Sequence, residues 1–374
     1  MEVAFLGEGI TALSAAFLIK KYFPNYKIYI IGKNLGGKIK TEILEFNNKK
    51  YFIELGPDSL VYNEKFQEIN NEFNLDKLNI IFSNNNPNYI FYNNKIYKIP
   101  DSILDFVLSN LISFSSKLQF ILDLFKEIKY DQNDTLRTFC EKNFNSEFNE
   151  KVLYPLFSNV FSTDVEKLSI IPLIPYLKNI KKNILKNSRT RFFNLKNGLG
   201  SLVKYFYNYL IQNDTEFINE NLVYFDIDKN IKKTNDKNYI LKTDSNNIVV
   251  SKVFFTLPSF NLNEVIINSI NQSKNLVQNI EILTLLKELS NLIKNISYHS
   301  SFIYILVFNK KLNFKGNGLL FNRHHLFKAI SFFNKKWNNI IDYPIDNSNF
   351  EFIRIFFKYN FNEDLDFLLK ELLK

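Results

Sequence analysis

The first residues of this chain place a glycine turn between a short apolar run and a helical pattern. Residues 3–6 form a continuous apolar run, Gly7-x-Gly9-x-x-Ala12 follows directly, and residues 13–20 carry apolar side chains at helical spacing. In such a context Gly7 makes the tight turn, Gly9 lets backbone N–H groups approach a pyrophosphate, and Ala12 lets the helix pack closely on the strand. The helix N-terminus then faces the phosphate charge. The motif predicts a dinucleotide-binding strand, turn and helix, although a glycine turn can also be purely structural.

A second continuous apolar run at 28–31 follows the predicted helix. Continuous runs of this kind are typical of parallel strands that are buried on both faces. The N-terminal region is therefore expected to begin a parallel α/β sheet. A chain of 374 residues exceeds what one hydrophobic core usually serves, so we expect at least two domains.

Further strands and helices are indicated along the chain. Residues 51–55 read as a strand, and two runs at 89–92 and 95–99, joined by Asn93-Asn94, read as a hairpin. From Asp101 to about Asn187 the spacing becomes helical, with Asp101 or Ser102 as N-cap. Later patterns predict strands, a long helix and two further strands, in the order 239–243, 248–256, 277–293, 301–308 and 352–357.

Composition narrows the choice of partners and compartment. The net charge of +9 would suit nucleic acid, an anionic membrane or an acidic substrate, but the lysines are scattered and read mostly as solvated surface. We expect no nucleic-acid partner. The single cysteine, Cys140, excludes an intrachain disulfide and fits a reducing compartment. Because the chain enters its first strand without a signal-peptide pattern, we expect a cytoplasmic protein.

Residues 101–130 carry a wide apolar stripe. Asp105, Lys117 and Asp123 interrupt it, which argues against a membrane-spanning helix. A helix that lies in the plane of the membrane interface tolerates such charges, so we expect a peripheral membrane contact here. Phe106 and Leu111 are the stripe residues whose replacement by Asp is expected to abolish the contact.

Two more glycine turns follow predicted strands. Gly36-Gly37-Lys38 comes after the second strand, and Gly56-Pro57-Asp58-Ser59 comes after the third. The carboxyl ends of parallel strands are where open α/β sheets bind their ligands. Either turn alone could be an ordinary loop. Together they indicate an extended dinucleotide rather than a mononucleotide.

In this order the segments resemble the flavin-binding half of the amine oxidase superfamily, and above all the oxygen-dependent protoporphyrinogen and coproporphyrinogen oxidase family. The resemblance continues along the chain in the family's order. It includes Gly36-Gly37-Lys38 with Thr41, the Glu54–Leu60 turn, Tyr154–Leu168, Phe193–Leu202 with Gly198-Leu199-Gly200, Thr256–Pro258 and Lys315–Arg323.

The resemblance implies an α/β fold with a Rossmann-like FAD-binding domain of the amine-oxidase type, an α+β substrate domain and a helical insertion. The FAD-binding domain would comprise 1–60 and 190–258, the substrate domain 61–100 and 259–374, and the membrane-associating insertion 101–189. Val223 matches a position whose backbone meets the adenine. The implied cofactor-binding residues are Gly7, Gly9, Ile10, Thr11, Ala12, Gly36, Gly37, Lys38, Gly56, Pro57, Asp58, Ser59 and Val223.

The implied activity is FAD-dependent oxidation of protoporphyrinogen IX or coproporphyrinogen III to the porphyrin, with oxygen as acceptor, in haem biosynthesis. The cofactor carries this chemistry, so no catalytic acid–base pair is expected. Arginine is scarce, and Arg323, beside the late loop, is the best candidate to bind a substrate carboxylate. The alternatives are another flavin amine oxidase or carotenoid desaturase, or a catalytically eroded relative that acts as a binding protein.

Two features depart from the family's pattern. The acid expected at the end of the second strand for the ribose hydroxyls is absent, since Ile30-Ile31-Gly32-Lys33 stands there. Lys33 could favour a 2′-phosphate, but the glycine segments favour FAD. The chain also ends at Lys374, where the family continues with a final flavin-binding segment, so weaker FAD binding and slower turnover are expected. The three histidines, His299, His324 and His325, are expected to be structural, and no metal site is expected.

Overall fold

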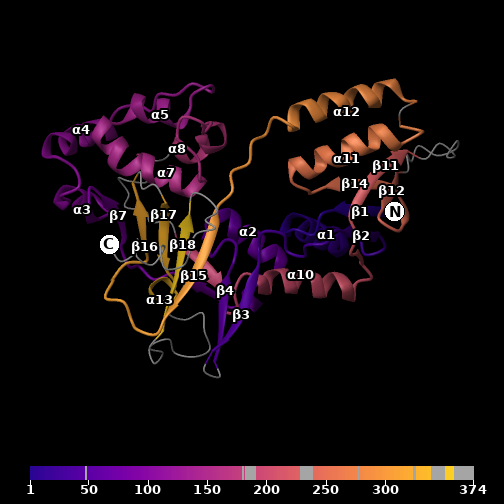
Figure 1. Cartoon of the computed structure of the whole chain (residues 1–374), viewed down its shortest axis with the longest axis horizontal. Coiled ribbons are helices and arrows are strands. Elements are labelled where there is room, and N and C mark those ends of the chain that lie inside the picture. The colour runs from indigo at the N-terminus through magenta and orange to yellow at the C-terminus, as the bar shows by residue number, and fades with distance from the viewer. Residues whose placement is uncertain are drawn as a thin grey trace. The chain divides into compact units, whose positions relative to one another are not determined.

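The computed structural model describes residues 1–46, 49–178, 181, 191–227, 239–276, 278–322, 326–337 and 350–357. The chain forms two compact units, shown in Figure 1. The first comprises Met1–Leu60, Glu64–Ile80 and Asn194–Tyr298, and the second comprises Val61–Asn63, Ile81–Phe193 and His299–Lys374. The division of these residues into FAD-binding, substrate and helical domains stays a prediction.

The first unit contains a four-stranded sheet in the order β10-β2-β1-β14, in which every pair of neighbours is parallel. The strands are β10 (Glu216–Ile218), β2 (Lys27–Ile31), β1 (Glu2–Leu6) and β14 (Lys252–Phe255). Helix α1 (Ile10–Tyr22) joins β1 to β2 and confirms the predicted strand–helix–strand start. The apolar runs at 3–6 and 28–31 are buried, as expected of strands covered on both faces.

Helices and a second sheet cover this parallel sheet. Helix α10 (Gly200–Gln212) packs against α1, where Phe206 meets Phe17 edge to face. The other core joins Ala4 and Leu6 to Val265 of α11 (Ser259–Gln272) and to an antiparallel sheet. That sheet consists of β11 (Leu222–Ile227), β12 (Tyr239–Thr243) and β13 (Asn247–Val250). Helix α12 (Ile280–Ile293) lies along α11, as Figure 1 shows.

The segment 248–256, expected as one strand, is two strands. β13 pairs antiparallel with β12, whereas β14 joins the parallel sheet beside β1. The chain changes sheet at Ser251, whose N–H donates to the carbonyl of Glu2 at 2.9 Å. Ser251-Lys252 interrupts the apolar residues of this segment, and the change of partner strand falls there.

The first unit also contains a hairpin and a helix, and three short strands cross the boundaries between the two units. β3 (Thr41–Phe46) and β4 (Lys49–Glu54) form an antiparallel hairpin, and α2 (Glu64–Phe73) precedes the short 3₁₀ helix η1 (Leu75–Leu78). β5 (Leu60–Tyr62), β9 (Arg191–Leu195) and β6 (Ile80–Phe82) form a three-stranded sheet at segments where the chain passes from one unit to the other.

The second unit is built on a six-stranded mixed sheet in the order β15-β18-β17-β16-β7-β8. Only β16 and β7 pair in parallel. The predicted hairpin is confirmed as β7 and β8, with Asn93 and Asn94 in the left-handed conformation that its turn requires. The strands and the short helix α13 are β15 (Phe302–Phe308), β18 (Glu351–Phe357), β17 (Phe327–Phe332), β16 (Gly318–Phe321), β7 (Asn88–Tyr92), β8 (Lys95–Lys98) and α13 (Phe333–Lys336).

Short helices follow β8 and enclose a separate apolar core with Phe106, Leu111 and Cys140. Ser102 is the N-cap of the first of them and accepts from the Asp105 N–H at 3.0 Å, as predicted. Burial raises the pKa of the Cys140 thiol to about 12, which is typical of a thiol inside a core. The elements are α3 (Ile103–Leu108), α4 (Phe114–Leu124), α5 (Leu136–Asn143), α6 (Ser146–Phe148), the π-helical turn η2 (Asn149–Leu153), α7 (Tyr154–Phe161), η3 (Ile171–Leu173) and α8 (Ile174–Leu177).

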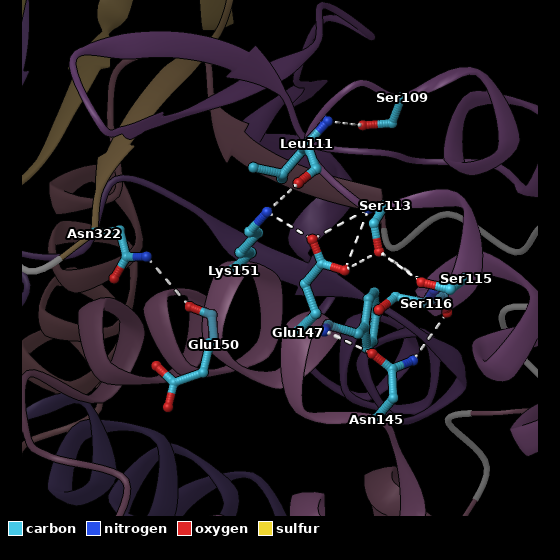
Figure 2. A network of polar contacts seen from close by, with 11 residues as sticks. Ser109, Leu111, Ser113, Ser115, Ser116, Asn145, Glu147, Glu150, Lys151 and Asn322 are labelled. Carbon is cyan, nitrogen blue, oxygen red and sulfur yellow. Dashed lines mark hydrogen bonds and ion pairs between the residues drawn. The ribbon is translucent and has the colours of Figure 1, made fainter.

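Glu147 fixes the junction between α3 and α4 (Figure 2). Its carboxylate accepts from the backbone N–H and the hydroxyl of Ser113, the N-cap of α4, and pairs with Lys151 at 2.6 Å. Lys151 also donates to the carbonyl of Leu111 at 2.9 Å. The turn between the two helices is therefore bonded at Leu111 to Lys151 and at Ser113 to Glu147.

Among the residues that the structure describes, no helix is long and apolar enough to cross a membrane.

Candidate site at the glycine turns

The first two glycine turns are in backbone contact at the carboxyl ends of β1 and β2. The N–H of Gly36 donates to the carbonyl of Glu8 at 2.8 Å, and Gly9 and Gly36 form an isolated parallel bridge. A Cβ atom on Gly37 would lie 3.1 Å from the Cα of Gly9. The two turns can approach this closely because position 37, which has a φ of +61°, carries no side chain.

Gly7 makes the turn that the sequence predicted. Its φ of +109° is a conformation that side chains disfavour, and a Cβ there would lie 2.9 Å from Oγ1 of Thr256. Thr256 directly follows β14, and its hydroxyl donates to the carbonyl of Leu6 at 2.7 Å. Thr256-Leu257-Pro258 therefore lies beside the first glycine turn, which brings together two segments that are far apart in the sequence.

Gly9 precedes α1 and leaves space in front of the helix. Its backbone is extended, no side chain caps the helix, and the first turn, which contains Ile10, Thr11 and Ala12, has no acidic residue. A Cβ on Gly9 would have no heavy atom within 4 Å. The N–H groups of this turn and the positive end of the helix can therefore receive an anionic group.

The third glycine turn lies on the second. A Cβ on Gly56 would stand 1.9 Å from the carbonyl oxygen of Lys38, so any side chain would force the two turns apart. The N–H of Leu55 donates to the carbonyl of Lys40 at 2.8 Å. Lys38 in the second turn and Pro57 in the third turn are both exposed.

Glu54, at the end of β4, joins this turn to the start of α10. Its buried carboxylate accepts from the Leu199 N–H at 2.6 Å and from the Thr41 hydroxyl at 2.7 Å. The Thr41 hydroxyl in turn accepts from the N–H of Gly200 at 2.7 Å. Asn194 donates to Glu54 at 3.3 Å and to the carbonyl of Asp58 at 3.0 Å. In the same turn Ser59 donates to the Asp58 carboxylate at 3.0 Å.

A second part of the site lies at the carboxyl end of β2, beside β10. Lys33 pairs with Asp244 at 2.8 Å, and Asp244 also accepts from the N–H of Asn221. Val223 lies two residues further on, at a bulge where the register with β12 shifts between Leu222 and Tyr224. A bulge leaves its extra residue outside the ladder of strand hydrogen bonds, so the Val223 backbone can contact a ligand.

Sequence reasoning missed four side chains of this site, Glu8, Thr41, Glu54 and Asn194, as functional candidates. Glu8 is buried against the end of β2, and Thr41, Glu54 and Asn194 form the network between the second and third turns and α10. The available signal was an acid inside the first glycine turn together with a glycine, Gly32, at the strand end where an acid was expected.

Other candidates lie outside this site or outside the described residues. Arg323, His324 and His325 are not among the residues that the structure describes. His299 contacts the Thr163 hydroxyl at 3.2 Å. Arg137 pairs with Glu141 and Glu166 at the surface. Within the described ranges, no group of three or more His, Cys, Asp or Glu side chains could hold a metal ion.

No protein-family profile matches the sequence. Two curated relatives are similar to part of the chain. Coproporphyrinogen III oxidase of Staphylococcus aureus is 31% identical over 190 residues, which cover 47% of this chain and 40% of that protein. Mitochondrial protoporphyrinogen oxidase of Nicotiana tabacum is 24% identical over 197 residues, covering 48% of this chain and 36% of that protein. The matches thus span well under half the length of these relatives, and they confirm the resemblance to the porphyrinogen oxidases.

Solved structures share the fold over 95% to 100% of the chain. A protein of Exiguobacterium sp. 255-15 named "Putative protoporphyrinogen oxidase" has a TM-score of 0.73 at 20% identity, covering 100% of this chain and 81% of that one. A putrescine oxidase variant has a TM-score of 0.65 at 10% identity, covering 95% and 75%. These likenesses confirm the predicted α/β fold class.

Proposed function

We propose that this chain, whose sequence resembles the porphyrinogen oxidases, binds FAD and oxidises a porphyrinogen to the porphyrin. The observation that carries the proposal is the contact of three glycine turns at the carboxyl ends of β1, β2 and β4, with open space in front of Gly9. Because glycines stand at these contacts, the backbone of the turns can come close to an extended dinucleotide, as its binding requires.

Each part of the site has a separate role in this proposal. The N–H groups at the start of α1, from Ile10 to Ala12, hold the pyrophosphate charge, and Lys38 adds a cation beside them. Gly36, Gly37 and the 56–59 turn line the path of the cofactor, and the Val223 backbone meets the adenine. Bound FAD supplies the hydride acceptor and the route to oxygen, so the chain itself needs only to bind, orient and exclude water.

The ion pair of Lys33 bears on the choice between FAD and a 2′-phosphorylated dinucleotide. A lysine at this strand end would favour a 2′-phosphate if its charge were available. Here the ammonium group lies 2.8 Å from the Asp244 carboxylate. Binding a phosphate would require that pair to be given up, and this supports FAD.

The proposed substrate is protoporphyrinogen IX or coproporphyrinogen III, with oxygen as acceptor, in keeping with the names of the curated relatives. Arg323 is proposed to bind a propionate of the substrate. The alternatives are another flavin amine oxidase or carotenoid desaturase, and a non-catalytic binding protein. These alternatives differ from the leading proposal in which substrates, if any, the purified chain is expected to oxidise.

The deciding experiment uses the purified full chain. Its absorbance spectrum is recorded, it is titrated with FAD in a calorimeter, and porphyrin fluorescence is followed after addition of each porphyrinogen under air. The proposal expects FAD binding and a porphyrin signal that depends on both FAD and oxygen. Absence of FAD binding refutes the flavoprotein proposal. FAD binding with oxidation of amines or carotenoids alone favours the first alternative, and binding without turnover of any of them favours the second.

A peripheral membrane contact through α3 and α4 is proposed as part of the same function. These helices expose large apolar side chains, among them Phe114 at 76% and Phe125 at 75% of their surface. The turn between the helices is fixed by Glu147, so the apolar side chains are presented by an ordered surface (Figure 2). The exposed apolar residues are Leu104, Val107, Leu108, Phe114, Leu118, Leu122 and Phe125.

The sequence-based choice of Phe106 and Leu111 for this contact was wrong. Both are buried in the helical core, at 4% and 2% exposure. The helical pattern was treated as one continuous face, but the break between α3 and α4 changes the face that each part presents. A bilayer contact would have to use the exposed set above.

A further inference from the structure

Glu8, the residue between the two glycines of the first turn, lies across the carboxyl end of β2. A Cβ atom on Gly32 would come within 2.7 Å of Glu8 Cγ and 3.2 Å of its Cδ. No ordinary side-chain contact is that short, so only glycine at position 32 leaves the Glu8 side chain its place. Glu8 is 8% exposed, which is unusual for an acidic residue.

In this arrangement the acid stands in the first glycine turn, at Glu8, and a glycine stands at the end of the second strand, at Gly32. The end of the second strand in a dinucleotide-binding fold ordinarily supplies an acid that accepts hydrogen bonds from the adenosine ribose. In this chain that strand end is Gly32, and a carboxylate from the first glycine turn lies over it. We propose that Glu8 binds the ribose hydroxyls of the adenosine half of the dinucleotide, an inference that rests on the proposed FAD binding.

The surroundings of Glu8 leave its carboxylate able to accept hydroxyl groups. Burial raises the pKa of Glu8, and a hydrogen bond from the backbone of Asn34 acts in the opposite direction. One N–H donor uses only part of the capacity of two carboxylate oxygens. Among the described residues no ion pair includes Glu8, and the adjacent Lys33 is paired with Asp244.

The proposed adenine contact lies at the same strand ends. The N–H of Gly32 donates to the carbonyl of Ile218, the last residue of β10, at 3.1 Å. The chain then passes Asn221, which is bonded to the partner of Lys33, and reaches the bulge at Val223. A ribose bound by Glu8 would thus lie next to an adenine bound by the Val223 backbone.

A carboxylate in this position makes the site selective for one chemical class. It favours adenosine diphosphates with a free 2′-hydroxyl, disfavours the 2′-deoxy analogue because a hydrogen bond is lost, and repels a 2′-phosphate. A hydrogen bond to a charged group changes affinity by roughly ten- to a hundredfold.

The first test measures ligand affinity by calorimetry, without any turnover. The full chain is titrated with FAD, ADP, 2′-deoxy-ADP and adenosine 2′,5′-bisphosphate. Wild type is expected to prefer ADP to 2′-deoxy-ADP by about tenfold and to bind the bisphosphate least well. Glu8→Gln is expected to bind FAD about tenfold more weakly, to lose most of the preference for ADP and to tolerate the bisphosphate better. Glu45→Gln, an exposed carboxylate of β3, is the matched control and is expected to behave as wild type.

A second set of variants changes the position of the carboxylate and leaves an acid in the chain. Gly32→Ala adds the Cβ that collides with Glu8 and should reduce the ADP preference as Glu8→Gln does. The same substitution added to Glu8→Gly should have no further effect. The exchange Glu8→Gly with Gly32→Glu puts the acid at the strand end and should restore the preference. Circular dichroism of each variant checks that it is folded.

The outcomes separate the two proposals. If wild type binds neither FAD nor ADP, the proposed function fails and the inference fails with it. If wild type binds FAD but Glu8→Gln keeps full affinity and the full preference for ADP, the ribose assignment alone is overturned. If Glu8→Gln does not fold, the folded Gly32→Ala variant decides, since an unchanged preference there overturns the assignment equally.

Discussion

The carboxylate of Glu54 lies 2.6 Å from the backbone nitrogen of Leu199 and accepts its hydrogen bond. Glu54 ends β4 directly before the third glycine turn, and Leu199 is the residue before α10. A negative charge at the N-terminus of a helix also interacts favourably with the helix dipole. The N-terminus of α10 thus interacts with the Glu54 carboxylate, whereas the first turn of α1 contains no acidic residue. An anionic ligand is therefore expected at α1.

We expect Glu54→Gln to destabilise the chain by about 1 to 3 kcal/mol, because the Leu199 N–H and the Thr41 hydroxyl donate to different oxygens of the carboxylate and an amide keeps only one of them. The free energy of unfolding from denaturant titration measures the loss. Glu45→Gln on the exposed hairpin is expected to stay within about 0.5 kcal/mol of wild type. Equal stability of Glu54→Gln and Glu45→Gln would show that the network does not hold the third turn to α10.

Gly9→Ala and Gly56→Ala separate ligand binding from folding. A methyl group on Gly9 meets nothing within 4 Å, so stability should change by less than about 0.5 kcal/mol. FAD affinity should nevertheless fall by about tenfold or more, because the methyl group occupies the approach of the pyrophosphate. At Gly56 the methyl group would stand 1.9 Å from the Lys38 carbonyl, so both stability and FAD affinity should fall.

Calorimetry with FAD and denaturant titration give the two quantities for each variant. Gly9→Asp, which adds a negative charge to the same space, should abolish binding. Wild-type FAD affinity in Gly9→Ala would argue that the pyrophosphate does not lie at this turn.

Local patterns were sufficient for the elements whose signals lie within a few residues. The run at 3–6, the glycine turn and α1 follow from burial period and turn chemistry, and the left-handed Asn93 and Asn94 follow from the hairpin. The Ser102 cap is also a local signal. These parts of the fold do not depend on which distant segment comes to pack against them.

The parts that the sequence did not reveal depend on distant contacts. The N–H of Ser113 is bonded to Glu147, 34 residues away, at the break between α3 and α4, and Phe106 is buried against Phe148. Glu8 can be identified as a site residue only once Gly32 is known to lie beneath it. Likewise, Glu54 and Asn194 meet across 140 positions. Side-chain direction in such places is set by tertiary contacts, which spacing along the chain cannot show.

The exposed face of α3 and α4 predicts the result of liposome flotation. Phe114→Asp with Phe125→Asp should abolish flotation with phosphatidylcholine vesicles, because both side chains are about three-quarters exposed and their burial in lipid is lost. Phe260→Asp with Ile280→Asp, at exposed apolar positions in the first unit, is the matched control and should float as wild type. Loss of flotation in both double variants, or in neither, would count against this surface.

The last prediction concerns Glu147 and the acid stability of the second unit. Burial acts to raise the pKa of the Glu147 carboxyl, but the hydrogen bonds from Lys151 and Ser113 outweigh it and lower the pKa to about 2 from an ordinary 4.5. Because the folded-state pKa is lowered, the carboxylate stabilises the folded state fully above about pH 4.5. That contribution is lost as the pH falls from 4.5 towards 2. Since the side chain is partly exposed, we expect it to be about 1 to 2 kcal/mol.

The measurement is denaturant unfolding at a series of pH values, followed by the fluorescence of Trp337. This residue is the single tryptophan of the chain and is fully buried in the second unit. Glu147→Gln should be less stable than wild type by about 1 to 2 kcal/mol at pH 7, and the difference should shrink as the pH falls from 4.5 to about 2, because wild type loses the same charge over this range. Glu141→Gln, an exposed carboxylate on α5, should show no such convergence. A difference between wild type and Glu147→Gln that is constant with pH would mean that Glu147 stabilises the α3–α4 junction through packing rather than through its charge.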